Sequence, residues 1–416
     1  MVDCCSAPGL TPLETALEQL LAGIKISDRV KDVELQQACG LVLAQDISSG
    51  LNIPPADNSA MDGYAVRAED AQVGAGLKQV AKVFAGHPFS GEIKAGECAR
   101  IMTGGQVPTG CDAVVMQENT LAHKETSDGE VIVFNQAPKS GENIRCAGED
   151  IKVGQKVLKK GRRLTPADIG LLASLGCGQV CVFEPLVAAV ISTGDELKHP
   201  GEALAQGQFY ESNGYTVSAL LKRFGVTLIN YGIVPDDLDA LRETFTEADK
   251  VADVVITSGG VSVGEADYTK TVLEELGRID FWKLAIKPGK PFAFGYLPNS
   301  YFIGLPGNPV SAMVTLHQLA VPMLRKLSGE TTRPALRLPA VVSDPIKKSP
   351  GRTDFQRGVY AIAENGQLMV SNTGAQGSGI LRSMSLANCY IVLEQDRGRV
   401  EAGETVMIEP FDSLMS

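Results

Sequence analysis

The sequence contains little that would build a disulfide framework or a zinc site. Its nine cysteines are scattered and contain no Cys-x-x-Cys pair, so they fit reduced, buried thiols better than paired ones. Cys177 and Cys181 are interpreted as small core residues. The four histidines show no His-Glu-x-x-His spacing, which favours structural or surface roles over metal binding; they are His87, His123, His199 and His317.

The sequence also lacks any apolar run near the roughly 18 residues that a membrane span requires. Its amino terminus has neither the basic start nor the apolar core of a secretory signal. We therefore expect a cytoplasmic protein without membrane contact. The formal net charge of -11 argues against a general nucleic-acid binder, because neutralising phosphates needs a basic face. A negative net charge does not exclude a local basic pocket.

What the chain does have is an ordinary globular composition, with 44% apolar and 21% charged residues. At 416 residues it exceeds the size at which one hydrophobic core keeps growing. We therefore expect two to four domains.

The most informative stretch is 257–268, Thr-Ser-Gly-Gly-Val-Ser-Val-Gly-Glu-Ala-Asp-Tyr. An apolar, β-branched run precedes it and a helically spaced segment follows it, so the order is strand, glycine loop, helix. Gly259, Gly260 and Gly264 allow positive φ and close approach of a ligand, while loop and helix-start amides favour an anion.

Glu265 and Asp267 lie in the same loop. Two carboxylates beside a bound phosphate are unfavourable unless a divalent cation lies between them, which suggests a magnesium-bridged phosphoryl or nucleotide site. The alternative is a plain tight turn followed by a solvated, acidic helix start. The loop alone does not decide between the two.

The first 185 residues mix helical and strand signals. Thr11-Pro-Leu-Glu14 has the form of a capping box and predicts an amphipathic helix, and Thr165-Pro-Ala-Asp168 predicts another. The apolar segment 33–47 suggests a broken helix. We assign these parts to one helical domain, residues 1–50 plus 141–185. The residues between them predict short strands and turns, which we assign to an inserted β domain, residues 51–140, with strands near 80–84, 98–102, 113–116 and 131–134.

From residue 186 strands and helices alternate, which predicts a parallel sheet with crossover helices and ligands beyond the carboxyl ends of its strands. We assign residues 186–330 to this α/β domain. Its predicted strand ends carry acidic or glycine-rich segments, at 193–196, 236–237 and 259–267. Residues 331–416 show short strands and turns and predict a separate β-barrel domain.

Three lysines follow on a turn stiffened by prolines, Lys283, Lys287 and Lys290. A solvated basic edge is one interpretation. In an acidic chain, and beside carboxylate loops, an anion clamp is the other.

Four motifs occur in order: Asp57-Asn-Ser-Ala-Met-Asp-Gly-Tyr64, Ser258-Gly-Gly-Val-Ser-Val-Gly264, Lys287-Pro-Gly-Lys-Pro291 and Leu305-Pro-Gly-Asn-Pro-Val310. Together they resemble the MoeA family of molybdopterin molybdenumtransferases, which is related to the carboxyl-terminal domain of gephyrin. The resemblance extends from about Thr11 to Phe411.

This resemblance implies an α/β multidomain homodimer with a helical part, an inserted β part, an α/β part like the molybdopterin adenylyltransferases, and a terminal barrel. It implies that molybdate replaces the adenylate of adenylated molybdopterin in a magnesium-dependent step that releases AMP. It further implies a site shared by the two chains, and the molybdopterin adenylyltransferase is an additional candidate partner.

The family's functional positions transfer residue by residue. The resemblance implies catalytic roles for Asp62, Thr103, Asp150, Glu196, Asp236, Asp267, Lys283 and Lys287. Glu196 and Asp267 are the expected magnesium ligands. The expected binding residues are Gly259, Gly260, Ser262, Gly264, Lys290, Pro306, Pro309, Ser311, Arg357 and Ser378. One departure from the family pattern is Glu211, where relatives carry aspartate.

Two other functions compete with this one. A molybdopterin adenylyltransferase would resemble the α/β part alone, so the flanking domains argue against it. A gephyrin-like scaffold would need fused domains or an exposed recruiting groove, and the sequence shows no long linker or second adenylyltransferase-like part. Release of AMP separates the transferase from the adenylyltransferase, which consumes ATP.

Overall fold

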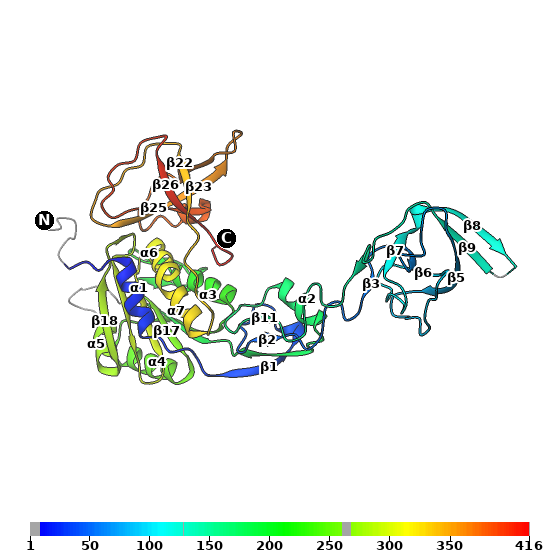
Figure 1. Cartoon of the computed structure of the whole chain (residues 1–416). Coiled ribbons are helices and arrows are strands. Elements are labelled where there is room, and N and C mark those ends of the chain that lie inside the picture. The colour runs from blue at the N-terminus through cyan, green and yellow to red at the C-terminus, as the bar shows by residue number, and fades with distance from the viewer. Residues whose placement is uncertain (1–8, 128, 260–267, 416) are drawn as a thin grey trace, which may run out of the picture. The chain divides into compact units, whose positions relative to one another are not determined.

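The computed structural model describes residues 9–127, 129–259 and 268–415, which form two compact units (Figure 1). Unit 1 comprises residues 1–31, 40–44 and 181–416, and unit 2 comprises residues 32–39 and 45–180. The predicted four-part division with its boundaries stays a prediction. Each unit is described separately below.

A six-stranded sheet forms the centre of unit 1. Its strands, in spatial order, are β16 (Thr227–Val234), β13 (Val187–Thr193), β17 (Val254–Ser258), β21 (Tyr301–Leu305), β20 (Pro291–Tyr296) and β18 (Arg278–Lys283). The first four are mutually parallel, as predicted. The last two pairings are antiparallel, so the sheet is mixed and the prediction of a parallel sheet is only partly right. The short turn between β20 and β21, closed by Leu297 N–H to the Ser300 carbonyl (2.9 Å), cannot supply the crossover that a parallel pair needs.

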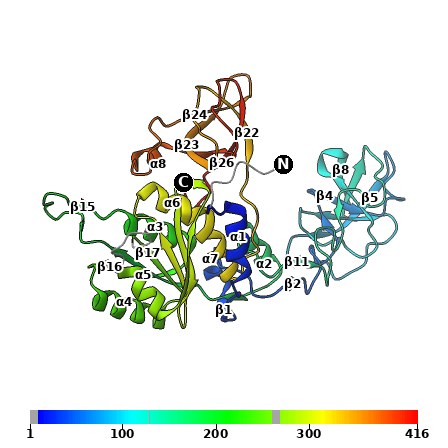
Figure 2. The ribbon, with the colours of Figure 1, turned by 90° about the vertical axis from the view of Figure 1, so that its left-hand side faces the viewer.

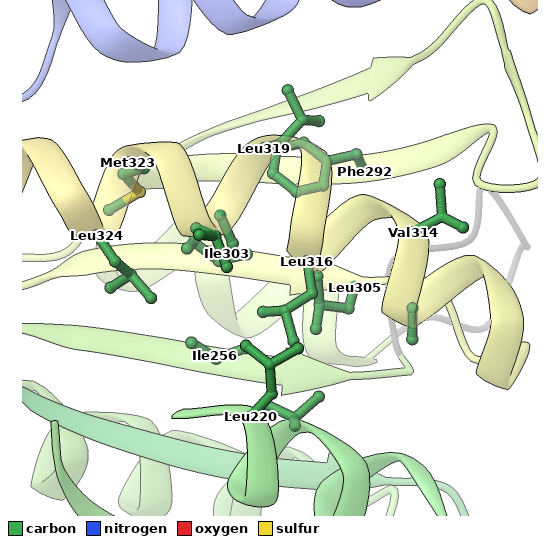
Figure 3. Packing of buried hydrophobic residues seen from close by; sticks show 14 of the residues in the cluster. Leu220, Ile256, Phe292, Ile303, Leu305, Val314, Leu316, Leu319, Met323 and Leu324 are labelled. Atoms are coloured by element: carbon green, nitrogen blue, oxygen red, sulfur yellow. The ribbon is translucent and has the colours of Figure 1, made fainter. Parts of the chain in front are cut away.

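Helices cover both faces of this sheet. Alternate residues of β13 explain this, because Ala188 and Val190 enter one apolar core while Ala189 and Ile191 enter the other. Helices α1 (Leu13–Ala22), α3 (Asn213–Phe224), α6 (Pro309–Thr315) and α7 (Val321–Leu327) lie on the first face, with a π-helical turn η3 (Leu316–Ala320) between the last two. Helices α4 (Leu238–Val251) and α5 (Tyr268–Leu276) lie on the second. Figure 3 shows the first core, with Leu220 of α3 and Ile256 of β17 near Leu316.

The first helix differs from its prediction in two ways. Pro12 precedes α1 and no side chain caps it, so the predicted capping box is wrong. The Thr11 backbone instead forms a bridge with residues 283–285: its N–H donates to the Lys283 carbonyl (2.8 Å), and its carbonyl accepts the Ala285 N–H (2.7 Å). Its apolar stripe packs beside α7 (Figure 2). That contact places α1 in unit 1, whereas the sequence analysis grouped it with residues 141–185.

Unit 2 is built on a second six-stranded sheet. Its strands, in spatial order, are β7 (Ala113–Met116), β4 (Gly63–Val66), β6 (Glu97–Ile101), β5 (Gly76–Val83), β9 (Gly129–Phe134) and β8 (Thr120–Thr126). Each of the four strands predicted for the inserted β domain overlaps one of these. Short ladders join β3 (Asn58–Ser59) to β10 (Ile144–Arg145) and β2 (Ile47–Ser48) to β11 (Lys156–Leu158).

The broken helix predicted for 33–47 is wrong. That segment contains the end of β1 (Val30–Glu34), one 3-10 turn, η1 (Leu35–Gln37), and the start of β2. The capping box at Thr165 is confirmed at the start of α2 (Pro166–Ser174). Asp168 N–H donates to Thr165 Oγ1 (3.3 Å), and Thr165 N–H donates to Asp168 Oδ2 (2.9 Å).

Asp168→Ala is expected to lower the free energy of unfolding of unit 2 by about 1–3 kcal/mol, because it removes a cap and leaves Arg162 without its carboxylate. Burial raises the pKa of Asp168, but hydrogen bonds from Arg162 and Thr165 outweigh it and hold the pKa below its usual value. Since the folded-state pKa is lowered, this stabilisation is present above the unfolded-state pKa and is lost as pH falls through the folded-state pKa.

Hydrogen exchange of the α2 amides across that pH range measures this stabilisation. Glu69→Ala, which breaks an exposed pair with Arg67, is the control and should have a smaller effect; equal protection in the two variants would contradict the prediction.

The carboxyl-terminal part of unit 1 is a β barrel, as predicted. Its strands follow the order β23 (Thr353–Ile362), β24 (Leu368–Asn372), β22 (Leu338–Val342), β26 (Thr405–Pro410) and β25 (Cys389–Leu393), and a pairing of β25 with β23 closes the ring. A short strand from the lysine turn, β19 (Ile286–Lys287), pairs in parallel with β23. The remaining short elements are α8 (Arg382–Leu386), β12 (Gln179–Phe183), β14 (Leu197–Lys198), β15 (Phe209–Tyr210) and η2 (Gln117–Asn119).

No helix in the described ranges is long and apolar enough to cross a membrane. The described cysteines are free thiols. Burial raises the pKa of Cys98, Cys111 and Cys389 to about 12, which makes these thiols unreactive at neutral pH. Cys177 and Cys181 are only half-buried, so the core interpretation fits them less well.

Candidate functional site

The carboxyl ends of β13 and β17 mark the place where the sheet of unit 1 can bind a ligand. These two strands are neighbours, yet the chain continues from them to helices on opposite faces, α3 and α5. Sheets of this kind bind ligands beyond the strand ends, where the connections diverge. Three predicted segments begin at this edge: those after β13, β16 and β17.

The segment after β13 carries Glu196 at its exposed surface. The Glu196 carboxylate folds over Gly194, where an added Cβ would lie 2.5–2.9 Å from the carboxylate atoms. Gly194 also has φ +141°, so a side chain at this position would be strained as well as crowded. Asp236, at the end of β16, donates its backbone N–H to Asp195 Oδ1 (3.1 Å). The structure thus brings the predicted residues Glu196 and Asp236 to one edge.

The segment after β17 begins with Gly259, whose positive φ of +94° and close approach both require glycine. A Cβ there would lie 2.7 Å from the Thr193 carbonyl oxygen. Its N–H donates to the Leu305 carbonyl (3.2 Å), so the loop starts between the ends of β13 and β21. The other predicted loop residues, Gly260, Ser262, Gly264 and Asp267, lie outside the described residues, and their roles stay predictions.

Sequence reasoning missed Asn213 as a site residue. Its side-chain amide is buried and donates to Ser258 Oγ (2.7 Å) and to the Gly307 carbonyl (2.8 Å). It therefore ties the start of α3 to the end of β17 and to the Pro306–Pro309 turn. The available signal was an asparagine at a predicted helix start, which also fits a simple cap.

Glu211 has a clear local role. Its carboxylate is buried and accepts the Gly214 N–H at 2.6 Å from Oε1. A carboxylate in this position satisfies a free amide of the first turn of α3 and opposes the positive end of the helix dipole. The glutamate side chain reaches this amide, and a role of Glu211 in the reaction stays untested.

The lysine turn lies at the same edge of the sheet. Lys283 ends β18 and pairs with Pro291, the first residue of β20, so residues 284–290 connect strand ends there. Gly289 has φ +109° and packs against α6, where a Cβ would lie 2.7 Å from Thr315 Cγ2. The predicted Lys287 and Lys290 are therefore held close to α6.

Two predicted hydroxyl residues adjoin this turn. Ser311 is buried in the first turn of α6. The backbone carbonyl of Ser378 accepts the Val310 N–H (3.0 Å). Pro306 is buried and Pro309 begins α6, so the proline turn fixes the direction of this helix start. The predicted oxyanion residues of unit 1 are thus gathered around α6.

Arg357 differs from the other predicted binding residues because it is fully buried. Its guanidinium donates to Ser383 Oγ (3.0 Å) and to the carbonyls of Phe355 and Gly377 (both 3.3 Å). Burial lowers its pKa, against an opposing effect of Asp354. These contacts hold the segment that contains Ser378, and direct binding of an anion by Arg357 stays a prediction.

In unit 2 the structure joins Asp62 to Thr103. Asp62 Oδ1 accepts both the backbone N–H (2.7 Å) and the hydroxyl (2.8 Å) of Thr103. These two hydrogen bonds lower the pKa of Asp62, with a smaller contribution from Arg100, so the carboxylate stays ionised at neutral pH. Asp150 is exposed, and no described side-chain contact links it to this pair.

Family models cover nearly the whole chain: the "MoeA N-terminal region (domain I and II)" matches residues 11–176, the "Probable molybdopterin binding domain" residues 189–326, and the "MoeA C-terminal region (domain IV)" residues 339–411. The chain belongs to the MoeA family. Within this family, the probable molybdopterin-binding domain is the α/β part of unit 1, which contains these strand ends.

Several relatives of this MoeA-family chain carry the name of an enzyme, molybdopterin molybdenumtransferase. It is 47% identical to the molybdopterin molybdenumtransferase of Haemophilus influenzae over 97% of the chain and 99% of that protein. It is 35% identical to the one from a Nostoc species, over 90% and 87%. The structure resembles a molybdopterin biosynthesis MoeA protein from Pyrococcus horikoshii, at 32% identity and a TM-score of 0.81, over 97% of this chain and 100% of that one. Gephyrin from Dictyostelium discoideum is 32% identical over 98% of the chain, which spans 64% of gephyrin.

Proposed function

We propose that this chain inserts molybdenum from molybdate into adenylated molybdopterin and releases AMP in a magnesium-dependent step. Its membership of the MoeA family places it in molybdenum cofactor biosynthesis. The observation that carries the finer proposal is the convergence of exposed acidic residues and the lysine turn beyond one edge of the sheet. Both substrates are anions, so cations and backbone amides favour their approach.

The described carboxylates are compatible with magnesium. Among the described residues no group of three or more histidine, cysteine, aspartate or glutamate side chains forms a metal cluster. Magnesium does not need one, because it commonly takes one or two carboxylates and completes its shell with substrate phosphates and water. Glu196 supplies an exposed carboxylate at the strand ends, and Asp267 is the second expected ligand. Bound there, magnesium would polarise the phosphoryl oxygens of the substrate.

The chain's own residues perform the rest of the work. Gly194 and Gly259 leave room for the Glu196 carboxylate and the Thr193 carbonyl at the strand ends, while Asn213 and Glu211 fix the start of α3 beside them. Lys287 and Lys290 offer positive charge to the incoming oxyanion. Because the glycine and proline turns already hold these groups, little conformational entropy is lost when substrate binds.

The test is a reaction containing purified chain, adenylated molybdopterin, molybdate and magnesium, in which mass spectrometry follows the pterin. We expect the adenylate to be lost and molybdenum to be gained. A pterin that keeps its adenylate, with folded protein present, would refute the proposal.

Lys287→Ala is expected to raise the KM for molybdate by about ten- to thirtyfold, the effect of losing one charged hydrogen-bond donor. The KM for adenylated pterin should change less, because the proposed ligand of the lysine is molybdate. Steady-state rates over a molybdate titration measure this, and activity should partly recover at high molybdate. Lys326→Ala, which removes an ammonium bound to the Leu21 carbonyl, is the control. No recovery at saturating molybdate would assign Lys287 to the chemistry or to the fold instead.

We further propose that the chain acts as a homodimer in the cytoplasm and receives its substrate from the molybdopterin adenylyltransferase. The support is the family resemblance, since the adenylated pterin must come from an adenylating reaction. Sedimentation equilibrium of the chain, alone and with that enzyme, tests both associations.

A further inference from the structure

Asp354, at the start of β23 in the barrel, lies next to the lysine turn. Strand β19 runs parallel to β23, with Lys287 directly opposite Asp354 in the register. A backbone hydrogen bond from Thr353 N–H to the Ala285 carbonyl (2.8 Å) fixes this register. Lys287 Nζ lies 3.5 Å from Asp354 Oδ2. The lysine is thus tied to the barrel as well as to the sheet.

The two partners differ sharply in exposure. The Asp354 side chain is 3% exposed, whereas that of Lys287 is 47% exposed. A buried carboxylate is costly unless it has a cation or hydrogen-bond donors. Asp354 Oδ2 accepts a hydrogen bond from Gln356 Nε2 (3.1 Å), and Lys287 supplies the cation from the solvent side. The buried Asp354 carboxylate therefore determines where the exposed Lys287 ammonium lies.

A second lysine nearby has other partners. Lys348 is buried and donates its ammonium hydrogens to the carbonyls of Ser349 (3.1 Å), Arg352 (2.8 Å) and Gln395 (3.4 Å). Burial lowers its pKa, with Asp354 opposing and Lys287 adding to that effect. Carbonyl groups hold Lys348, and the buried Arg357 guanidinium also feels the charge of Asp354. Of these three cations, Lys287 is the one in ion-pair contact with Asp354.

We infer that Asp354 is a positioning residue for molybdate capture: its buried carboxylate holds the Lys287 ammonium in the lysine turn, which packs against α6 at Gly289, and an oxyanion of the size of molybdate would bind there. This inference rests on the proposed function. A free lysine side chain samples many rotamers, and ordering it costs binding energy. Pairing with Asp354 restricts the ammonium before the anion arrives, while the Lys287 side chain stays 47% exposed.

Asp354→Asn is expected to raise the KM for molybdate by about three- to tenfold with kcat nearly unchanged, because Lys287 remains but is less ordered. Asp354→Glu, which keeps the charge, should restore part of the loss. In a Lys287→Ala background, Asp354→Asn should add almost nothing, since it acts through the lysine. Binding of molybdate to the chain alone, by equilibrium dialysis, should show the same pattern without turnover.

Glu409→Gln is the matched control. Glu409 is also a buried carboxylate of the barrel, paired with Arg337 (3.4 Å) and Gln318 (2.6 Å) and not in contact with Lys287. It should lose comparable stability without a change in molybdate KM.

Two results overturn the inference while the proposed function stands. One is an unchanged molybdate KM in Asp354→Asn. The other is a rise in molybdate KM on Asp354→Asn that is as large in the Lys287→Ala background as in the wild type. An active enzyme whose molybdate KM is insensitive to Lys287→Ala removes the lysine's role, and the inference with it. An inactive wild-type chain instead refutes the proposed function, whereas dialysis still measures the Asp354 effect on molybdate binding.

Discussion

Replacing Glu196 with glutamine is expected to lower AMP release by on the order of a hundredfold, because a bound metal ion commonly supplies several kcal/mol of transition-state stabilisation. Glutamine keeps nearly the size of the side chain, so it should still fold over Gly194. What it removes is the charge at the end of β13. Asp267→Asn should act in the same direction, since Asp267 is the other expected ligand and lies on the glycine loop after β17.

The measurement is AMP release by each variant over a magnesium titration. The magnesium midpoint should move to higher concentration, and binding of adenylated pterin should persist because the lysines and loop amides remain. Glu202→Gln is the matched control: Glu202 belongs to the same connection and makes a long pair with Lys198 (3.9 Å). Near-normal release with an unchanged midpoint would exclude Glu196 as a metal ligand.

The second large effect is expected at Asp62. Asp62→Asn should reduce turnover by on the order of a hundredfold, the lower end of the range for a group that takes a proton in a transition state. Asparagine Oδ1 can still accept both hydrogen bonds from Thr103, so the turn should keep its shape. The pKa of Asp62 in the folded chain is lowered. The wild-type carboxylate is therefore already ionised at neutral pH.

Turnover at saturating substrates, with thermal unfolding alongside, measures this effect. Asp112→Asn is the control, since Asp112 also accepts a backbone N–H, that of Ala68 at 2.7 Å, and its pKa is lowered too. It carries no predicted role and should stay near wild type. Equal losses in the two variants would show that Asp62 acts through the fold of unit 2.

Elements with strong periodicity and clear ends could be predicted from the sequence. Helix α3, strand β16 and helix α4 follow the predicted alternation of helices and strands. Their ends are marked by local signals, since Gly225 ends α3 and Asp237 caps α4. The strand-end position of Glu196 followed from the same alternation. These features depend on local spacing, which the sequence shows directly.

Features set by the choice of partner could not be predicted. The apolar stripe of α1 shows that it must be covered, but not that α7 covers it. The antiparallel direction of β20 depends on the short turn that joins it to β21. The composition of the sequence does not show whether these two strands run parallel or antiparallel. Asp354 looks like an ordinary polar residue in sequence, and only the pairing of β19 with β23 places it beside Lys287. Asn213 likewise gains its role from two segments distant in sequence.

The most direct test of the central claim is AMP release by the purified chain in the presence of adenylated molybdopterin, molybdate and magnesium, without added ATP. The account predicts one AMP for each molybdenum inserted, dependence on both molybdate and magnesium, and loss of release in Glu196→Gln. Molybdenum insertion without AMP, or AMP release indifferent to molybdate, would contradict it.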